Sequence, residues 1–138
     1  MRKVKCNDII ALMDEKEAIQ MQSQKLAYVG DGVHTLFVRE QLTKTHKGNI
    51  ASLSRACNNL CNAAAQEKAY FKLLEIATET EKQVANRARN CTLHHSAKNF
   101  SIESYRHATA FEAVVGFLYL TNQTERLQEV LALSLEEK

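Results

Sequence analysis

The chain has 138 residues, 45% of them hydrophobic and 25% charged, which is enough for one hydrophobic core and too little for two ordinary domains. Proline is absent, glycine occurs only four times, and the helix-favouring residues Ala, Leu, Glu, Lys and Gln are abundant. A net charge of +2 does not by itself select a class of partner. We therefore expect one all-α domain that spans residues 1–138.

The N-terminal segment has a basic start but turns acidic after a short apolar run, unlike a signal peptide. No apolar run reaches the length of about 18 residues that a membrane-spanning helix needs. We expect a cytoplasmic protein without membrane contact, in which Cys6, Cys57, Cys61 and Cys91 are reduced thiols. A zinc site at Cys57 and Cys61, or at Cys91 and His94, is the minor alternative because neither pair has the usual C-x-x-C spacing.

Caps and apolar periodicity predict the helices in chain order. The first half contains a short helix capped by Asn7 or Asp8 and ending near Asp14, a long helix from about Ser23 to Thr43, and an alanine-rich helix that is capped by Asn49, runs to Leu74 and is kinked near Asn58, Asn59 and Asn62. The second half contains a helix that begins with the capping box of Thr78 and Glu81 and ends near Asn90, a loop from Cys91 to Glu103, a helix capped by Ser104 that ends at Leu120, and a last helix from Glu125 to Leu135.

Asp31 is an isolated carboxylate in the largely apolar second helix, with Gly30 and Gly32 on either side. Each glycine costs about 1 kcal/mol relative to alanine in a helix, and an unpaired buried carboxylate costs more, so this arrangement needs a compensating role.

The helical wheel divides this helix into two faces. One is an apolar stripe predicted to pack in the core: Leu26, Val29, Val33, Leu36 and Phe37. Asp31 lies nearly opposite, among small or apolar residues that include Ala27, Tyr28 and Val38. This pattern predicts burial on one side and a cleft or partner on the other.

Glu112 repeats the anomaly as the only charge between Ala108 and Leu120. An isolated carboxylate on an apolar helix has three common roles: a cap or ion pair, a neutral acid of raised pKa, or a metal ligand. If the two helices pack together, Asp31 and Glu112 repel each other unless a cation lies between them. Oxygen-only ligation favours Mg²⁺ or Mn²⁺.

The segment from Asn86 to Phe100 contains three cationic side chains, two histidines and no acid. Such a segment is either a solvated loop or a surface that contacts phosphates.

The residues from Gln24 to Asp31 resemble the ribonuclease III signature, in which Glu, Arg, Leu, Glu, Phe, Leu, Gly and Asp follow in order. The segment TAFEAVVGFLYL resembles the second acidic segment of that family, with Glu112 on its glutamate and Gly116 on its glycine. The segments NRARN and AKN point further to Mini-ribonuclease III, the short bacterial branch. The resemblance extends from about Ser23 to Leu133.

The resemblance implies a ribonuclease III endonuclease-domain fold and a metal-dependent endoribonuclease that cleaves double-stranded RNA and leaves a 5′-phosphate. Asp31 and Glu112 would be the catalytic residues and the ligands of Mg²⁺, with Mn²⁺ as the substitute. The implied substrate is the precursor of 23S ribosomal RNA. The implied assembly is a homodimer without a double-stranded-RNA-binding domain, with a large-subunit ribosomal protein as a further candidate partner.

Two departures from the full-length enzymes concern the acidic positions. Ala27 stands where the second glutamate of the signature would be, and Thr109 stands where an aspartate precedes the glutamate by three residues. Mini-ribonuclease III enzymes share this reduced set, so the losses do not predict an inactive enzyme.

Further roles are predicted from position: the basic residues cluster in and around the loop before the helix that contains Glu112, and Tyr28 lies on the Asp31 face of its helix. The candidates for RNA contact are Arg87, Arg89, Lys98 and Arg106. Each is alternatively a surface charge or the partner of an acid or a helix C-terminus. Tyr28 is the candidate dimer contact, with a core aromatic as the alternative, and Gly30 and Gly32 are expected to let a helix of a second subunit approach closely.

Two other functions remain in comparison. The first is a non-catalytic RNA-binding or ribosome-associated module with the same fold, although such a protein has no need for two isolated acids. The second is an unrelated helical metal hydrolase acting on small phosphorylated molecules, which the lack of an H-x-x-x-D or H-D motif weakens.

Overall fold

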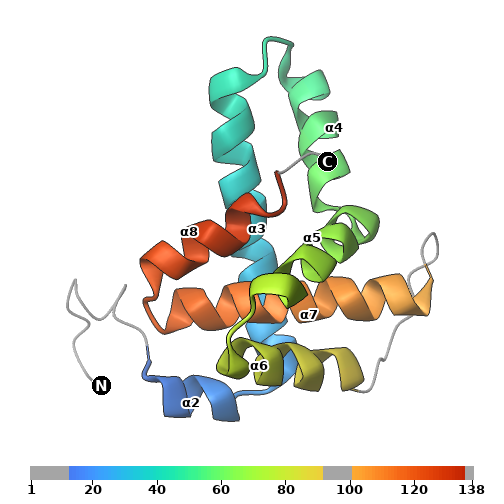
Figure 1. The fold of residues 1–138 in the computed structure, drawn as a ribbon. Coiled ribbons are helices and arrows are strands. Elements are labelled where there is room, and N and C mark those ends of the chain that lie inside the picture. The colour runs from blue at the N-terminus through green and yellow to red at the C-terminus, as the bar shows by residue number, and fades with distance from the viewer. Residues whose placement is uncertain (1–12, 92–100, 136–138) are drawn as a thin grey trace, which may run out of the picture.

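The computed structural model describes residues 13–91 and 101–135, and these residues form helices joined by short connections, with no strand (Figure 1). The helices are α2 (Glu15–Gln20), α3 (Ser23–Thr45), α4 (Ile50–Cys61), α5 (Ala63–Ile76), α6 (Glu79–Asn90), α7 (Ile102–Leu120) and α8 (Thr124–Ala132). The predicted all-α class is therefore confirmed. Among the described residues, no helix is both long and apolar enough to cross a membrane.

Helix α7 is the centre of the fold, and α3, α5, α6 and α8 pack around it (Figure 1). Its sequence explains this position, because a helix that is apolar on all sides must be covered on all sides. The side chains of Phe111, Val114, Val115 and Leu118 are fully buried.

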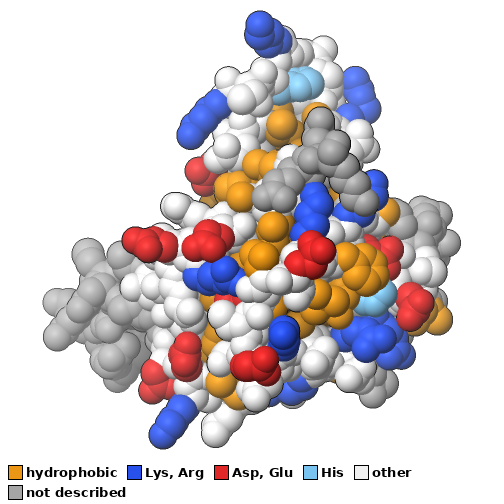
Figure 2. Space-filling view, viewed as in Figure 1, with side chains coloured by type: hydrophobic (Ala, Val, Ile, Leu, Met, Phe, Trp, Pro, Cys, Tyr) orange, Lys and Arg blue, Asp and Glu red, His pale blue; other side chains and the backbone are white. Residues whose placement is uncertain are grey.

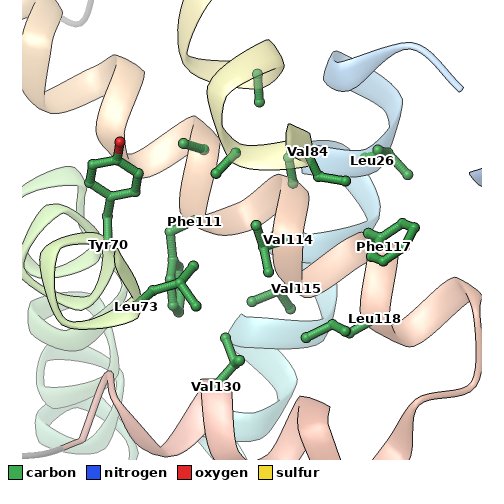
Figure 3. Packing of buried hydrophobic residues seen from close by; sticks show 14 of the residues in the cluster. Leu26, Tyr70, Leu73, Val84, Phe111, Val114, Val115, Phe117, Leu118 and Val130 are labelled. Atoms are coloured by element: carbon green, nitrogen blue, oxygen red, sulfur yellow. The ribbon is translucent and has the colours of Figure 1, made fainter. Parts of the chain in front are cut away.

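The core forms where apolar side chains of the other helices pack against α7 (Figure 3). Leu26 comes from α3, Leu73 from α5, Val84 from α6 and Val130 from α8, and all are buried. Residues far apart in the sequence thus share one core, as expected for a single domain.

Two predicted caps are confirmed by hydrogen bonds. The side chain of Asn49 accepts from the Ser52 N–H at 2.9 Å and begins α4. Thr78 and Glu81 form the expected capping box at the start of α6. These signals are local, so the sequence alone is sufficient to identify them.

Other helix boundaries differ from the prediction. Asp14 caps α2, because its side chain accepts from the Glu17 N–H at 2.9 Å, while the helix expected before it lies almost entirely outside the described residues. The expected kink is a break, where Asn62 ends α4 and caps α5. Ser101, rather than Ser104, caps α7. The last helix ends at Ala132, earlier than expected. The candidate caps Asn7 and Asp8 lie outside the described residues.

The buried face of α3 matches the predicted stripe only in part: Leu26 is buried, and Val33 and Phe37 pack against the core. Leu36 is 59% exposed, whereas Ala27, His34 and Val38 are buried within the chain. The reason is that the C-terminal half of α3 leaves α7 and pairs with α4 in an antiparallel hairpin, so two different partners cover one helix (Figure 1). Lysine and arginine side chains surround the tip of this hairpin, at the top of Figure 2.

Candidate active site

The site lies where α3 crosses α7, and two glycines determine how closely the helices approach. A Cβ atom added to Gly30 would overlap the carbonyl oxygen of Glu112, and one added to Gly116 would overlap the carbonyl oxygen of Leu26. Only residues without a side chain fit at this crossing. The close partner of Gly30 is therefore α7 of the same chain, not a helix of a second subunit as the sequence suggested. Gly32 has no neighbouring atom within 4 Å of its Cβ position.

This close crossing brings Asp31 and Glu112 together. Asp31 is exposed at the rim of the site, and Glu112 is half-buried beside it. Burial, and then the hydrogen bond and negative charge of Asp31, raise the pKa of Glu112 to about 9, while a hydrogen bond from Gln66 opposes the shift. Two carboxyl groups so close together in a partly buried position share a proton or need a cation.

A buried polar network lies behind Glu112. The amide nitrogen of Gln66, on α5, lies 3.2 Å from Glu112 Oε2 and 3.1 Å from His34 Nδ1. Because an amide nitrogen only donates, Nδ1 of His34 accepts and the neutral ring carries its proton on Nε2. Burial lowers the pKa of His34 to about 4, although the charge of Asp31 opposes this, so the ring is neutral at pH 7. In the described part of the chain, His34 Nε2 is the buried side-chain polar atom that lacks a hydrogen-bond partner.

The chemistry of Asp31 and Glu112 fits Mg²⁺ or Mn²⁺. Among the described residues, no group of three or more His, Cys, Asp or Glu side chains could hold a metal ion, so this pair provides only two carboxylates. Mg²⁺ commonly keeps several waters and binds through one or two carboxylates plus the phosphates of a substrate. The zinc alternative loses support here, because neither Cys57 nor Cys61 belongs to such a group, while His94 lies outside the described residues.

The predicted RNA contacts have different environments. Arg87 donates hydrogen bonds to Ser23 Oγ at 3.1 Å, to Met21 O at 2.8 Å and to Ile19 O, and thereby ties α6 to the α2–α3 connection. Ile19 and Met21 lie at the C-terminal end of α2, so Arg87 takes the alternative role of a partner to a helix C-terminus.

The other two candidates that the structure describes lie on α6 and α7. Arg89 is half-buried near the end of α6. Burial raises the pKa of Tyr70, and the positive charge of Arg89 opposes this shift. Arg106 is half-buried on the N-terminal part of α7. Lys98 lies outside the described residues.

Among the described residues, Tyr28 is the most exposed large hydrophobic side chain, with 83% of its surface accessible, and it lies on α3 one turn before Asp31. Its alternative role as a core aromatic is excluded. Ala27 and Val38, by contrast, are covered by their own chain. They do not form an exposed apolar face with Tyr28, which corrects the expectation from the helical wheel.

Sequence reasoning missed His34 and Gln66, which stand next to the site. The available signal was a polar side chain on the buried face of an apolar helix, but His34 lies outside the apolar stripe that the wheel identified on α3. It also missed the pair of Glu67 and His107, whose Oε2 and Nδ1 atoms lie 2.5 Å apart between α5 and α7. Tyr70 stacks on the His107 ring, which makes this pair part of the helix packing.

Comparisons with known proteins agree with this fold. The sequence model of the ribonuclease III domain matches residues 24–123. The chain is 40% identical to a Mini-ribonuclease 3 of Symbiobacterium thermophilum over 106 residues, which cover 77% of this chain and 82% of that relative. It is 38% identical to a Mini-ribonuclease 3 of Clostridium tetani over 115 residues, covering 83% and 76% of the two chains.

The fold also resembles the crystal structure of a protein from Fusobacterium nucleatum, with a TM-score of 0.77 and 24% identity over 89% of this chain and 97% of that one. The match to the domain model contains both Asp31 and Glu112. The chain therefore belongs to the ribonuclease III family of endoribonucleases, in its Mini-ribonuclease III branch.

Proposed function

We propose that the protein is a metal-dependent endoribonuclease that cleaves double-stranded RNA and acts in the maturation of the 23S ribosomal RNA precursor. The observation that carries this proposal is the pair of Asp31 and Glu112, which the glycine crossing of α3 and α7 brings together. A protein that only binds RNA gains nothing from placing two carboxyl groups against each other at a cost in electrostatic energy.

Asp31 and Glu112 would hold Mg²⁺, with Mn²⁺ as the substitute. When bound, the metal would lower the pKa of a bound water and polarise the scissile phosphate, which leads to hydrolysis with a 5′-phosphate on one product. Without a cation, Glu112 keeps a proton near neutral pH. A divalent ion competes with that proton, so tighter binding is expected as the pH rises.

RNA would be held by basic side chains from the end of α6 to the start of α7 in the sequence. The main candidates are Arg89, Lys98 and Arg106, because the guanidinium of Arg87 already donates hydrogen bonds to backbone and side-chain oxygens. Contacts to phosphates and 2′-hydroxyls would recognise the shape of a duplex more than its sequence. A homodimer would present one carboxylate pair to each strand, and a large-subunit ribosomal protein is a further proposed partner.

The test is single-turnover cleavage of a double-stranded precursor RNA with and without Mg²⁺. Wild type should cleave only with the metal. Asp31→Asn and Glu112→Gln keep the side-chain volume but remove the charge, so each should slow cleavage at least about 100-fold, because even outer-shell partners of metal ligands contribute about 10- to 100-fold.

RNA binding separates this proposal from the alternatives. Asp31→Asn should bind RNA as well as wild type does, whereas Arg89→Ala should bind more weakly and with a smaller salt dependence. Cleavage near the wild-type rate in either carboxylate variant would show that the metal assignment is wrong at that position. Metal-independent RNA binding without cleavage by wild type would favour the non-catalytic module.

A further inference from the structure

The polar network behind Glu112 costs more free energy than apolar helix packing at the same place would. Gln66 is 3% exposed and His34 is completely buried, so both polar side chains have lost nearly all contact with solvent. His34 Nε2 has no hydrogen-bond partner among the described residues. An unpaired buried N–H costs about 1–3 kcal/mol, which an apolar side chain at this position would avoid.

The hydrogen bonds of this network all lead toward the carboxylate pair. Gln66 has two amide hydrogens, and the distances of 3.2 Å to Glu112 Oε2 and 3.1 Å to His34 Nδ1 use both of them. His34 in turn packs edge to face against Phe111, the neighbour of Glu112 on α7, with ring centroids 5.3 Å apart. The amide of Gln66 is therefore fixed at both hydrogens and cannot rotate without losing a buried bond.

We propose that Gln66, oriented by His34, is a positioning residue that holds the Glu112 carboxylate in the orientation required for binding a divalent cation with Asp31. This inference rests on the proposed function of the same site. The hydrogen bond to Oε2 fixes one oxygen of the carboxyl group, and thereby the plane in which the group faces Asp31. Outer-shell donors and acceptors of this kind orient metal ligands in many sites, and their loss typically lowers metal affinity about 10- to 100-fold.

The arrangement also explains why three helices meet at this point. His34 comes from α3, Gln66 from α5 and Glu112 from α7, so the network sets the position of the carboxyl group relative to each of the helices that form the site. A glutamine is suited to this place because its amide is neutral at every pH and donates to two acceptors at once.

The experiment measures Mn²⁺ binding to the RNA-free protein by electron paramagnetic resonance of the free ion. Gln66→Leu removes the donor at similar volume and should raise the Kd for Mn²⁺ about tenfold or more. His34→Phe keeps an aromatic ring beside Phe111 but removes the acceptor, and should shift the Kd in the same direction. In cleavage assays, both variants should need more Mg²⁺ for half-maximal rate and recover at saturating Mg²⁺.

A matched control separates positioning from stability. Glu81 is 2% exposed and bonded to Arg126 at 2.8 Å, away from the carboxylate pair. Glu81→Gln should lower the melting temperature, yet leave the Mn²⁺ affinity unchanged. If Gln66→Leu behaves like this control, the inference is overturned while the proposed function stands.

The remaining outcomes are also distinct. If Gln66→Leu fails to fold, His34→Phe decides the question by the same measurement. If wild type binds no Mn²⁺, or if Asp31→Asn binds it as tightly as wild type, the metal site itself is wrong, and the inference fails with the proposed function.

Discussion

At the scale of single residues, Glu112 is the side chain on which opposing effects converge. Burial and Asp31 favour its neutral form, while the N–H of Gln66 favours its anion. Burial and Asp31 outweigh Gln66, and the pKa of Glu112 therefore rises from 4.5 to about 9. A carboxyl group of this kind is costly to ionise without a nearby cation, and a bound cation removes that cost.

This balance predicts how stability depends on pH without metal. Between pH 4.5 and about 9, folded Glu112 retains a proton that the unfolded chain has lost, so the free energy of unfolding falls as the pH rises. His34 acts in the opposite direction, but only between its folded value of about 4 and its unfolded value of 6.5. Between pH 6.5 and 9, the pH dependence of the free energy of unfolding therefore reflects Glu112 and not His34.

Melting temperatures in a chelator should fall across this window for wild type and fall clearly less for Glu112→Gln. Adding Mg²⁺ at pH 9 should restore much of the loss in wild type alone. A wild-type curve parallel to that of Glu112→Gln would mean that Glu112 ionises normally in the folded protein.

At the scale of helices, the crossing of α3 and α7 depends on backbone contact. Gly30 and Gly116 face each other's helix, and the position of Asp31 beside Glu112 follows from this approach. The two glycines that flank Asp31 thus have different roles, because Gly30 lies in the crossing while Gly32 faces open space. Only the first compensates for its low helix propensity by allowing close packing.

Alanine at the two positions should have opposite effects. Gly30→Ala forces a methyl group onto the α7 backbone and should destabilise the protein by about 1–3 kcal/mol or more, with loss of cleavage as the carboxylates separate. Gly32→Ala should stabilise it by up to about 1 kcal/mol, because alanine favours the helix and meets no neighbour. Chemical denaturation measures both. Equal effects would contradict the crossing geometry.

The same helices show what a sequence can and cannot predict. The caps at Asn49 and Thr78 and the span of α3 were predictable, because a cap or an apolar period is encoded within a few neighbouring residues. The isolated carboxylates Asp31 and Glu112 stood out for the same reason. The buried face of α3 was not predictable, since it depends on which helix covers each half. Gln66 could not be linked to Glu112 without the packing of α5 on α7.

At the scale of the whole molecule, one chain leaves apolar surface uncovered beside its site. Tyr28 is 83% exposed and Leu36 is 59% exposed, both on α3, on either side of Asp31 in the sequence. Exposed apolar residues next to a functional group are typical of an interface. A symmetric dimer that uses this part of α3 would bring two carboxylate pairs to the same face of the assembly, as cleavage of both strands requires.

We expect light scattering at micromolar concentration to give twice the 15.6 kDa mass of one chain. Tyr28→Lys should shift the protein toward monomers, because a charge at the centre of an apolar interface is costly to desolvate. Ile50→Lys is the matched control, since Ile50 is 77% exposed at the start of α4 and away from Asp31. It should remain dimeric and active.

The Tyr28 variant should lose cleavage of both strands of a duplex while its circular dichroism spectrum stays helical. A wild-type monomer that still cuts both strands, or a Tyr28→Lys dimer, would rule out this interface.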